Sequence, residues 1–147
     1  MNYNRVDILL VEDNPNDVKL TLRALKRNNL VNEIKVVSDG AEALDYLFAR
    51  NEYSERNFED FPQVIFLDLK LPKINGLEVL EQIKANPKTK KIPVVIVTSS
   101  GEDSDLKRCY ELGANSYVIK PVNFDSFVES VSKLGFYWLI LNKTPRE

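Results

Sequence analysis

Acidic, hydroxyl and basic side chains follow the short apolar runs of this chain. Glu12 and Asp13 come directly after one run, and Asp68 comes directly after another. Thr98 and Lys120 follow two further runs. Crowded carboxylates repel one another and favour a bound cation, while a hydroxyl and an ammonium can contact phosphoryl oxygens. These residue types predict chemistry on a phosphoryl group, provided that the fold brings them together.

Asp68 is the candidate for the residue that receives the phosphoryl group. An aspartate is already ionised at neutral pH, so it can attack phosphorus without a general base. The chain contains no histidine, which excludes a histidine base and histidine-ligated zinc. We expect Glu12 and Asp13 to hold a metal ion, and a set of oxygen ligands favours Mg²⁺ or Mn²⁺ over zinc.

The elements that must position these residues alternate along the chain. Runs rich in branched apolar residues predict strands, and patterns with the helical period separate them. Asn14 and Pro15 are typical of a helix start, and Gly113 of a helix end. The predicted strands are 8–11, 34–37, 64–67, 94–97 and 117–119; the predicted helices follow Asn14, cover 41–49, 77–84 and 103–112, and begin again at Asn123.

Continuous apolar strands that alternate with helices indicate a parallel sheet covered on both faces. We therefore predict an α/β fold, a doubly wound, flavodoxin-like sheet of five parallel strands in the order 2-1-3-4-5. In this order the first and third strands are neighbours, and ligands bind at the carboxyl ends of the strands. Glu12, Asp13 and Asp68 are thus expected to converge on one pocket, with Thr98 and Lys120 beside them.

The composition sets the broad class of the protein. A length of 147 residues suits one domain, and a net charge of −2 argues against a nucleic-acid partner. Cys109 is the single cysteine, so no intramolecular disulfide can form. The chain shows no signal-peptide pattern, and its longest apolar run, 136–141, is too short for a membrane span. We expect a cytoplasmic protein without a membrane partner.

One segment departs from the regular alternation. Residues 50–61, RNEYSERNFEDF, are polar, charged and longer than a usual connection between a helix and a strand. We interpret them as an exposed surface loop, an insertion that the fold tolerates rather than a binding element.

Four motifs resemble the receiver domain of two-component response regulators. They are ILLVEDN, VIFLDLKLPKINGLEVL, IPVVIVTSS and GANSYVIKPV, and the resemblance runs from about Val6 to Phe127. It implies that Asp68 accepts a phosphoryl group from a sensor histidine kinase. It also implies that Glu12, Asp13, Asp68 and the backbone carbonyl of Lys70 bind Mg²⁺.

The resemblance assigns roles to five further positions. Thr98 and Lys120 contact the acyl phosphate, and a cis peptide before Pro121 aims Lys120 inward. Tyr117 aligns with the switch aromatic of the family, which turns when phosphorylation draws Thr98 toward the phosphoryl oxygens. Gly76 aligns with the turn glycine of the family before the third helix, where a positive φ is tolerated.

The carboxyl-terminal part carries a more individual signal. The run FYWLIL places apolar residues around the whole last helix, so part of its surface is expected to remain for a partner. The long loop and this ending resemble small stand-alone regulators that serve phytochrome-type histidine kinases. We expect residues 1–147 to form a single receiver domain with an extended C-terminal helix. The expected homodimer uses the face of helix four, strand five and helix five together with the tail.

Other functions stay open at this point. A metal-dependent phosphohydrolase with an aspartyl-phosphate intermediate uses similar residues, although such enzymes place an Asp-x-Asp pattern after the first strand. A flavin-binding module shares the fold, but the acidic VEDNPND segment would repel a flavin phosphate. A receiver that never accepts phosphate is a further alternative. The main expectation is a signalling switch that is not an enzyme beyond its own phosphorylation and slow dephosphorylation.

Overall fold

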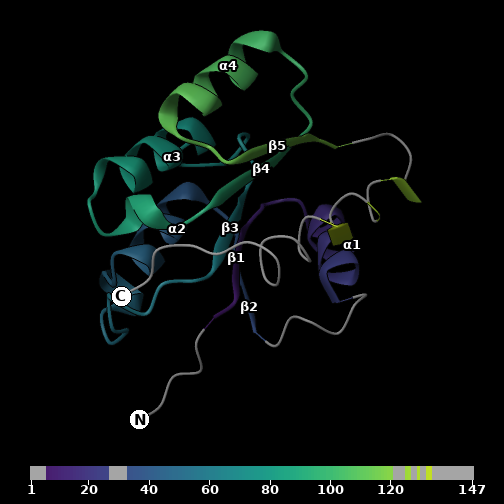
Figure 1. Ribbon diagram of the computed structural model, residues 1–147. Coiled ribbons are helices and arrows are strands. Elements are labelled where there is room, and N and C mark those ends of the chain that lie inside the picture. The colour runs from purple at the N-terminus through teal and green to yellow at the C-terminus, as the bar shows by residue number, and fades with distance from the viewer. Residues whose placement is uncertain (1–5, 27–32, 121–124, 127–128, 130–131, 134–147) are drawn as a thin grey trace.

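The protein forms one parallel sheet with helices on both faces (Figure 1). The computed structural model describes residues 6–26, 33–120, 125–126, 129 and 132–133. The strands lie in the order β2-β1-β3-β4-β5, and all neighbours are parallel. This is the predicted flavodoxin-like order. The strands are β1 (Ile8–Val11), β2 (Ile34–Val37), β3 (Val64–Leu67), β4 (Val94–Thr98) and β5 (Ser116–Ile119).

The helices begin and end where local side chains satisfy the free backbone groups of their termini. The Asn14 side chain accepts hydrogen bonds from the backbone of Asn16 and Asp17, as expected of an N-cap. At the other end of a helix, Gly113 adopts φ 105 and stops α4 in the left-handed conformation. The α-helices are α1 (Pro15–Lys26), α2 (Gly40–Leu47), α3 (Gly76–Ala85) and α4 (Asp103–Leu112). Two short 3₁₀ turns are η1 (Asn51–Tyr53) and η2 (Thr89–Lys91).

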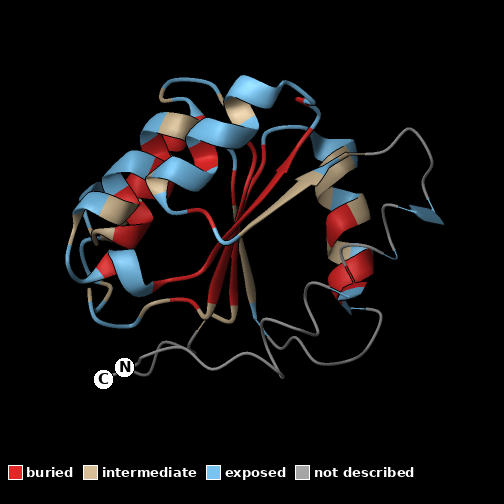
Figure 2. Cartoon of the chain, turned by 45° about the horizontal axis from the view of Figure 1, so that its top comes forward, coloured by how far each residue is buried: buried red, intermediate tan, exposed pale blue. Residues whose placement is uncertain are grey.

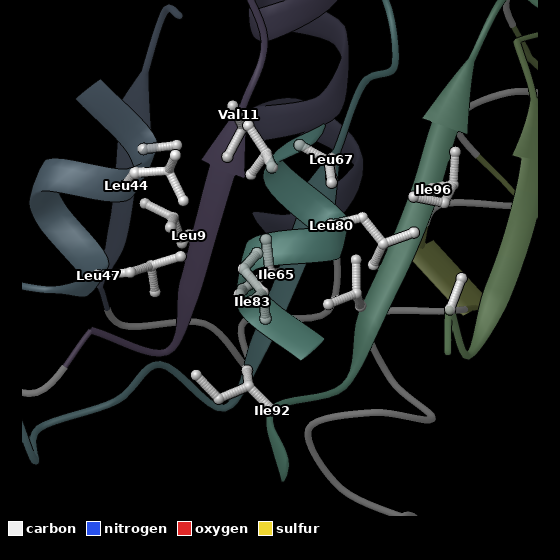
Figure 3. Packing of buried hydrophobic residues seen from close by; sticks show 14 of the residues in the cluster. Leu9, Val11, Leu44, Leu47, Ile65, Leu67, Leu80, Ile83, Ile92 and Ile96 are labelled. Atoms are coloured by element: carbon white, nitrogen blue, oxygen red, sulfur yellow. The ribbon is translucent and has the colours of Figure 1, made fainter. Parts of the chain in front are cut away.

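Alternate residues of the strands face two separate cores. Leu9 and Ile65 pack with α2 and α3 on one face, as Figure 3 shows, while Ile8 and Phe66 pack with α1 on the other. The central strands are buried along their whole length, and the helices bury the sides that face the sheet (Figure 2). Each fully buried side chain of this size contributes about 1.5–3 kcal/mol. The sheet is therefore a rigid platform, and its edges carry the polar residues.

Residues 50–61 form an exposed to half-buried surface loop, as expected, and several of its side chains pack against α2. The Tyr53 hydroxyl donates to Glu42 Oε2 at 2.6 Å, and its ring meets Tyr46 edge to face at 5.1 Å between centroids. The Arg56 guanidinium lies over the Tyr46 ring at 4.2 Å and donates to the Tyr46 carbonyl. The Phe58 ring contacts the rings of Phe48, before the loop, and Phe61, at its end. These contacts fasten the loop to α2.

Several expectations fall on residues outside the described part of the chain. They are the cis peptide before Pro121, the start of the last helix at Asn123, and the apolar run 136–141. Within the described residues, no helix is long and apolar enough to cross a membrane.

Candidate functional site

Glu12 and Asp68 lie side by side because the strands that precede them are paired. Val11 is the register partner of Leu67, so the next residue of each strand leaves the sheet at the same place. The backbone continues the ladder there, since the Asp68 amide donates to the Val11 carbonyl at 3.1 Å. Glu12 is 3% exposed and Asp68 is 5% exposed. The sheet order thus brings two carboxylates into a pocket that is largely closed to water.

Asp13 completes a group of three carboxylates with the chemistry of a hard-metal site. One oxygen each from Glu12, Asp13 and Asp68 lies within 4.8 Å of the other two, and Asp13 is exposed. All the donors are anionic oxygens, the ligands that Mg²⁺ and Mn²⁺ prefer. A single cation among them would relieve their mutual repulsion. The residues present therefore fit a divalent cation.

Lys120 supplies the positive charge of the pocket. Its ammonium donates to Glu12 Oε1 at 2.6 Å, to Asp68 Oδ2 at 2.9 Å and to Asp17 Oδ2 at 2.8 Å. The backbone places it, because the Lys120 amide donates to the Thr98 carbonyl at 2.7 Å and so continues the pairing of β5 with β4. The lysine faces the acidic pocket, as the sequence predicted.

The pKa values of the pocket reflect burial working against charge pairing. Burial raises the pKa of Glu12 to about 7; the hydrogen bond from Lys120 lowers it, and the charge of Asp68 raises it. Burial alone would lower the pKa of Lys120, but the hydrogen bonds to Asp17, Glu12 and Asp68 raise it above its ordinary value. The ammonium is thus fixed in its charged form, and the pocket retains an excess of negative charge.

Thr98 lies at the end of β4, and the following loop connects it to Tyr117. Thr98 is fully buried, and its Oγ1 accepts a hydrogen bond from the Ser100 amide at 3.3 Å. The Tyr117 hydroxyl donates to the Ser100 carbonyl at 2.9 Å. The Ser100 hydroxyl donates to Asp105 in the first turn of α4. Ser100 is therefore hydrogen-bonded to Thr98 of β4, to Tyr117 of β5 and to Asp105 of α4.

The loop after Asp68 is shaped by close packing at Gly76. The Asp68 side chain accepts a hydrogen bond from the Lys70 amide at 3.1 Å, which folds the loop back over the carboxylate. A Cβ on Gly76 would lie 2.3 Å from the Asp68 carbonyl oxygen. Gly76 does not use the positive φ that a glycine tolerates; within this loop the positive φ, 67, occurs at Lys73. Gly76 is required for the close approach of α3 to Asp68.

Asp17 is the site residue that the sequence reasoning missed. Acids are common in the first turn of a helix for a local reason, so the position of Asp17 in α1 gave no sign of a role in the site. One signal could have found it: Asp17 comes three residues after the N-cap Asn14. The first turn of a helix that follows β1 begins at the carboxyl edge of the sheet, where the other site residues lie. Because the local reason is sufficient, nothing in the sequence pattern alone points to a second role for Asp17.

The fold and the acidic pocket together define the class of protein. The chain matches the response regulator receiver domain family over residues 8–132. This chain belongs to the response regulator receiver domain family, so it is a signalling protein of two-component systems. The match is to a receiver and gives no support to the phosphohydrolase alternative.

Individual relatives cover almost the whole chain. A probable methanogenesis regulatory protein, FilR2 of Methanothrix harundinacea, is 42% identical over 94% of this chain and 86% of its own length. The response regulator Rcp1 of Synechocystis is 39% identical over 90% of this chain and 88% of its own. The Mn²⁺-bound structure of Rcp1 has a TM-score of 0.87 at 38% identity and covers 94% of this chain and 97% of that structure. The bacteriophytochrome response regulator RtBRR is 54% identical, with a TM-score of 0.75 and coverage of 94% and 82%.

Proposed function

We propose that Asp68 is the phosphoryl acceptor of a signalling switch and that a sensor histidine kinase is the donor. The observation that carries the proposal is the pocket itself, in which Asp68 Oδ2 lies 2.9 Å from the Lys120 ammonium, beside Glu12 and Asp13. In the reaction, an Asp68 carboxylate oxygen forms a bond to phosphorus. The bond between phosphorus and the kinase imidazole breaks, and the imidazole nitrogen keeps the electron pair.

A divalent cation, Mg²⁺ or Mn²⁺, would be held by Glu12, Asp13, Asp68 and the backbone carbonyl of Lys70. When bound, it neutralises charge on the phosphoryl oxygens during transfer. The Mn²⁺-bound form of Rcp1 supports this assignment. The chain's own contribution includes the buried carboxylates of Glu12 and Asp68, whose positions are fixed by the paired ends of β1 and β3.

Thr98 and Lys120 are the proposed contacts of the phosphoryl oxygens, and Tyr117 is the proposed switch. Thr98 is buried at the end of β4, so its hydroxyl can reach a group on the neighbouring Asp68 after a small movement. The movement would reach Tyr117 through Ser100, whose amide binds Thr98 and whose carbonyl binds the tyrosine hydroxyl. A phosphoryl group that binds one arrangement better than the other then shifts their populations.

The proposed output is contact with other proteins in the cytoplasm. Leu106 and Tyr110 on α4 and Ile119 on β5 are exposed large apolar residues that support a homodimer through this face. Such a dimer would also use the last helix and the tail of a single receiver domain spanning 1–147. A phytochrome-type kinase is the proposed donor, and the 54% identity to a bacteriophytochrome response regulator supports that choice.

Incubation with acetyl phosphate and Mg²⁺, followed by intact-mass measurement, tests the proposal. We expect wild type to gain one phosphoryl group, Asp68→Asn to gain none, and the matched control Asp103→Asn in exposed α4 to behave as wild type. Light scattering on the same samples tests the dimer. An unmodified wild type, or a modified Asp68→Asn, would contradict the acceptor assignment; a monomer mass in both states would contradict the dimer.

A further inference from the structure

Asp17 accepts a hydrogen bond from Lys120 but is not one of the three carboxylates that could hold a metal ion. Its Oδ2 lies 2.8 Å from the Lys120 ammonium, and its side chain is 28% exposed against 12% for Lys120. The carboxylate comes from the first turn of α1, whereas Lys120 follows β5, 103 positions away along the chain. A contact between such distant segments depends on the fold and is not a by-product of helix capping.

The donors of Lys120 are fully used by three carboxylates. An ammonium has three N–H groups, and here they point to Glu12, Asp68 and Asp17. In the part of the chain that the structure describes, the group that could hold a metal ion consists of Glu12, Asp13 and Asp68. Two of the three partners of Lys120 are therefore also candidates to bind a cation, and Asp17 is the third.

A divalent cation and the ammonium compete for the same oxygens. When Glu12 and Asp68 turn to a cation, they become weaker partners for Lys120, and the two positive charges repel each other. The flexible four-carbon stem of a lysine would then carry its strongly hydrated ammonium into water. Asp17 offers an anionic partner at hydrogen-bond distance that the cation does not use.

We propose that Asp17 is a positioning residue, which keeps the Lys120 ammonium beside Asp68 while Glu12 and Asp68 bind a divalent cation. The inference rests on the proposed function, because it concerns the metal-loaded pocket that receives the phosphoryl group. Asp17 makes no contact with the reacting atoms in this role. It acts through Lys120, which stays within reach of the oxygens of a group on Asp68.

Chemical labelling of lysines tests the proposal without a phosphoryl donor. Each protein is treated with an amine-acetylating reagent with and without Mg²⁺, and labelling of Lys120 is read by peptide mass spectrometry relative to Lys73, whose side chain is 69% exposed. In wild type, Lys120 stays protected in both conditions. In Asp17→Ala, Mg²⁺ increases Lys120 labelling about tenfold, the ratio expected for one lost hydrogen bond between charged groups.

Control variants separate positioning from a general loss of structure. Asp17→Glu keeps an anionic partner and should restore protection, while Asp17→Asn keeps a neutral acceptor and should give an intermediate value. Asp103→Ala removes an acid from the first turn of α4 and should leave Lys120 protected. Thermal melting followed by circular dichroism identifies a variant that fails to fold. If Asp17→Ala fails to fold, Lys120 labelling in Asp17→Asn is compared with wild type instead.

Three results would overturn the proposal. The first is that Mg²⁺ makes Lys120 reactive in wild type. The second is that Lys120 stays protected from labelling in Asp17→Ala when Mg²⁺ is present. The third is that Lys120 of Asp17→Glu is labelled as strongly as Lys120 of Asp17→Ala. The proposed function fails separately, through an unmodified wild type in the acetyl phosphate experiment. The two failures are therefore distinguishable.

Discussion

Two lysine side chains enter the protein at opposite edges of the sheet and meet different surroundings. Lys120 lies at the carboxyl edge, with three carboxylates around its ammonium. Lys84 lies near the end of α3, at the amino edge, where its ammonium donates to the carbonyls of Lys90 at 3.0 Å and Ile92 at 2.8 Å. The carbon chain of Lys84 packs against Gly113 at the end of α4.

The difference between the two lysines appears in their pKa values. Burial lowers the pKa of Lys84 to about 8, and the described hydrogen bonds of its ammonium go to backbone carbonyls. The pKa of Lys120 is raised above its ordinary value despite its burial, because three anions surround it. The amino edge uses a lysine to join two helices and a turn. The carboxyl edge holds a positive charge among carboxylates.

The largest expected effect is a loss of stability at the carboxyl edge that Mg²⁺ reverses. Lys120→Met leaves buried carboxylates without their positive partner and should lower the free energy of unfolding by about 3 kcal/mol, the low end for a broken buried pair. The low end applies because Glu12 can take up a proton, given its pKa of about 7. Saturating Mg²⁺ should recover most of the loss, since it supplies positive charge to the same oxygens. Urea unfolding with and without Mg²⁺ measures both values.

Lys84→Met is the matched control for this experiment. It removes a lysine of similar burial that has no carboxylate partner in the described interactions, so its effect on stability should be the same with and without Mg²⁺. Equal Mg²⁺ dependence in the two variants would show that the carboxyl edge is not distinguished by its charge pairing.

Gly76→Ala tests how closely the carboxyl edge is packed. The new methyl group would lie 2.3 Å from the Asp68 carbonyl oxygen and 2.5 Å from the Leu69 Cα, so the loop that carries Asp68 must move. Overpacking of this kind costs about 1–3 kcal/mol. The control is Gly101→Ala at the same edge, where the nearest atom is Ile119 Cδ1 at 3.8 Å. We expect slower phosphorylation of Asp68 by acetyl phosphate in Gly76→Ala alone; equal rates in both variants would refute the role of close packing.

The parts of the fold that repeat a periodic pattern could be predicted from the sequence. Strands β1 and β3 are continuous apolar runs, and their order followed from the rules for parallel sheets, so the meeting of Glu12 with Asp68 could be deduced. The end of α4 at Gly113 could be predicted because helices often end at a residue with a positive φ, which favours glycine. In each case one physical preference, repeated or local, is enough to determine the structure.

The parts that depend on contacts between distant side chains could not be predicted. Asp17 has a local reason to begin a helix, so nothing in the pattern indicates its bond to Lys120. The polar composition of residues 50–61 concealed the packing of Tyr53 and Arg56 around Tyr46. A Cβ at position 76 would lie 2.3 Å from the Asp68 carbonyl oxygen, so a glycine is needed there. No local sequence pattern encodes this distance.

The smallest expected effect is a pH dependence that only the amino-edge lysine should show. Below pH 8 Lys84 is charged in both the folded and the unfolded protein, and the folded state bears the full cost of its burial. Between about pH 8 and the ordinary lysine value near 10.4, the folded amine is neutral while the unfolded amine keeps its proton, so stability rises with pH by less than about 1.4 kcal/mol per unit. Lys120 has a raised pKa, so its contribution is constant over this range and is lost only at higher pH. The difference in unfolding free energy between wild type and Lys84→Met should therefore climb in wild type's favour from pH 8 to 10. A level difference would mean that the two carbonyls keep the Lys84 ammonium charged throughout this range.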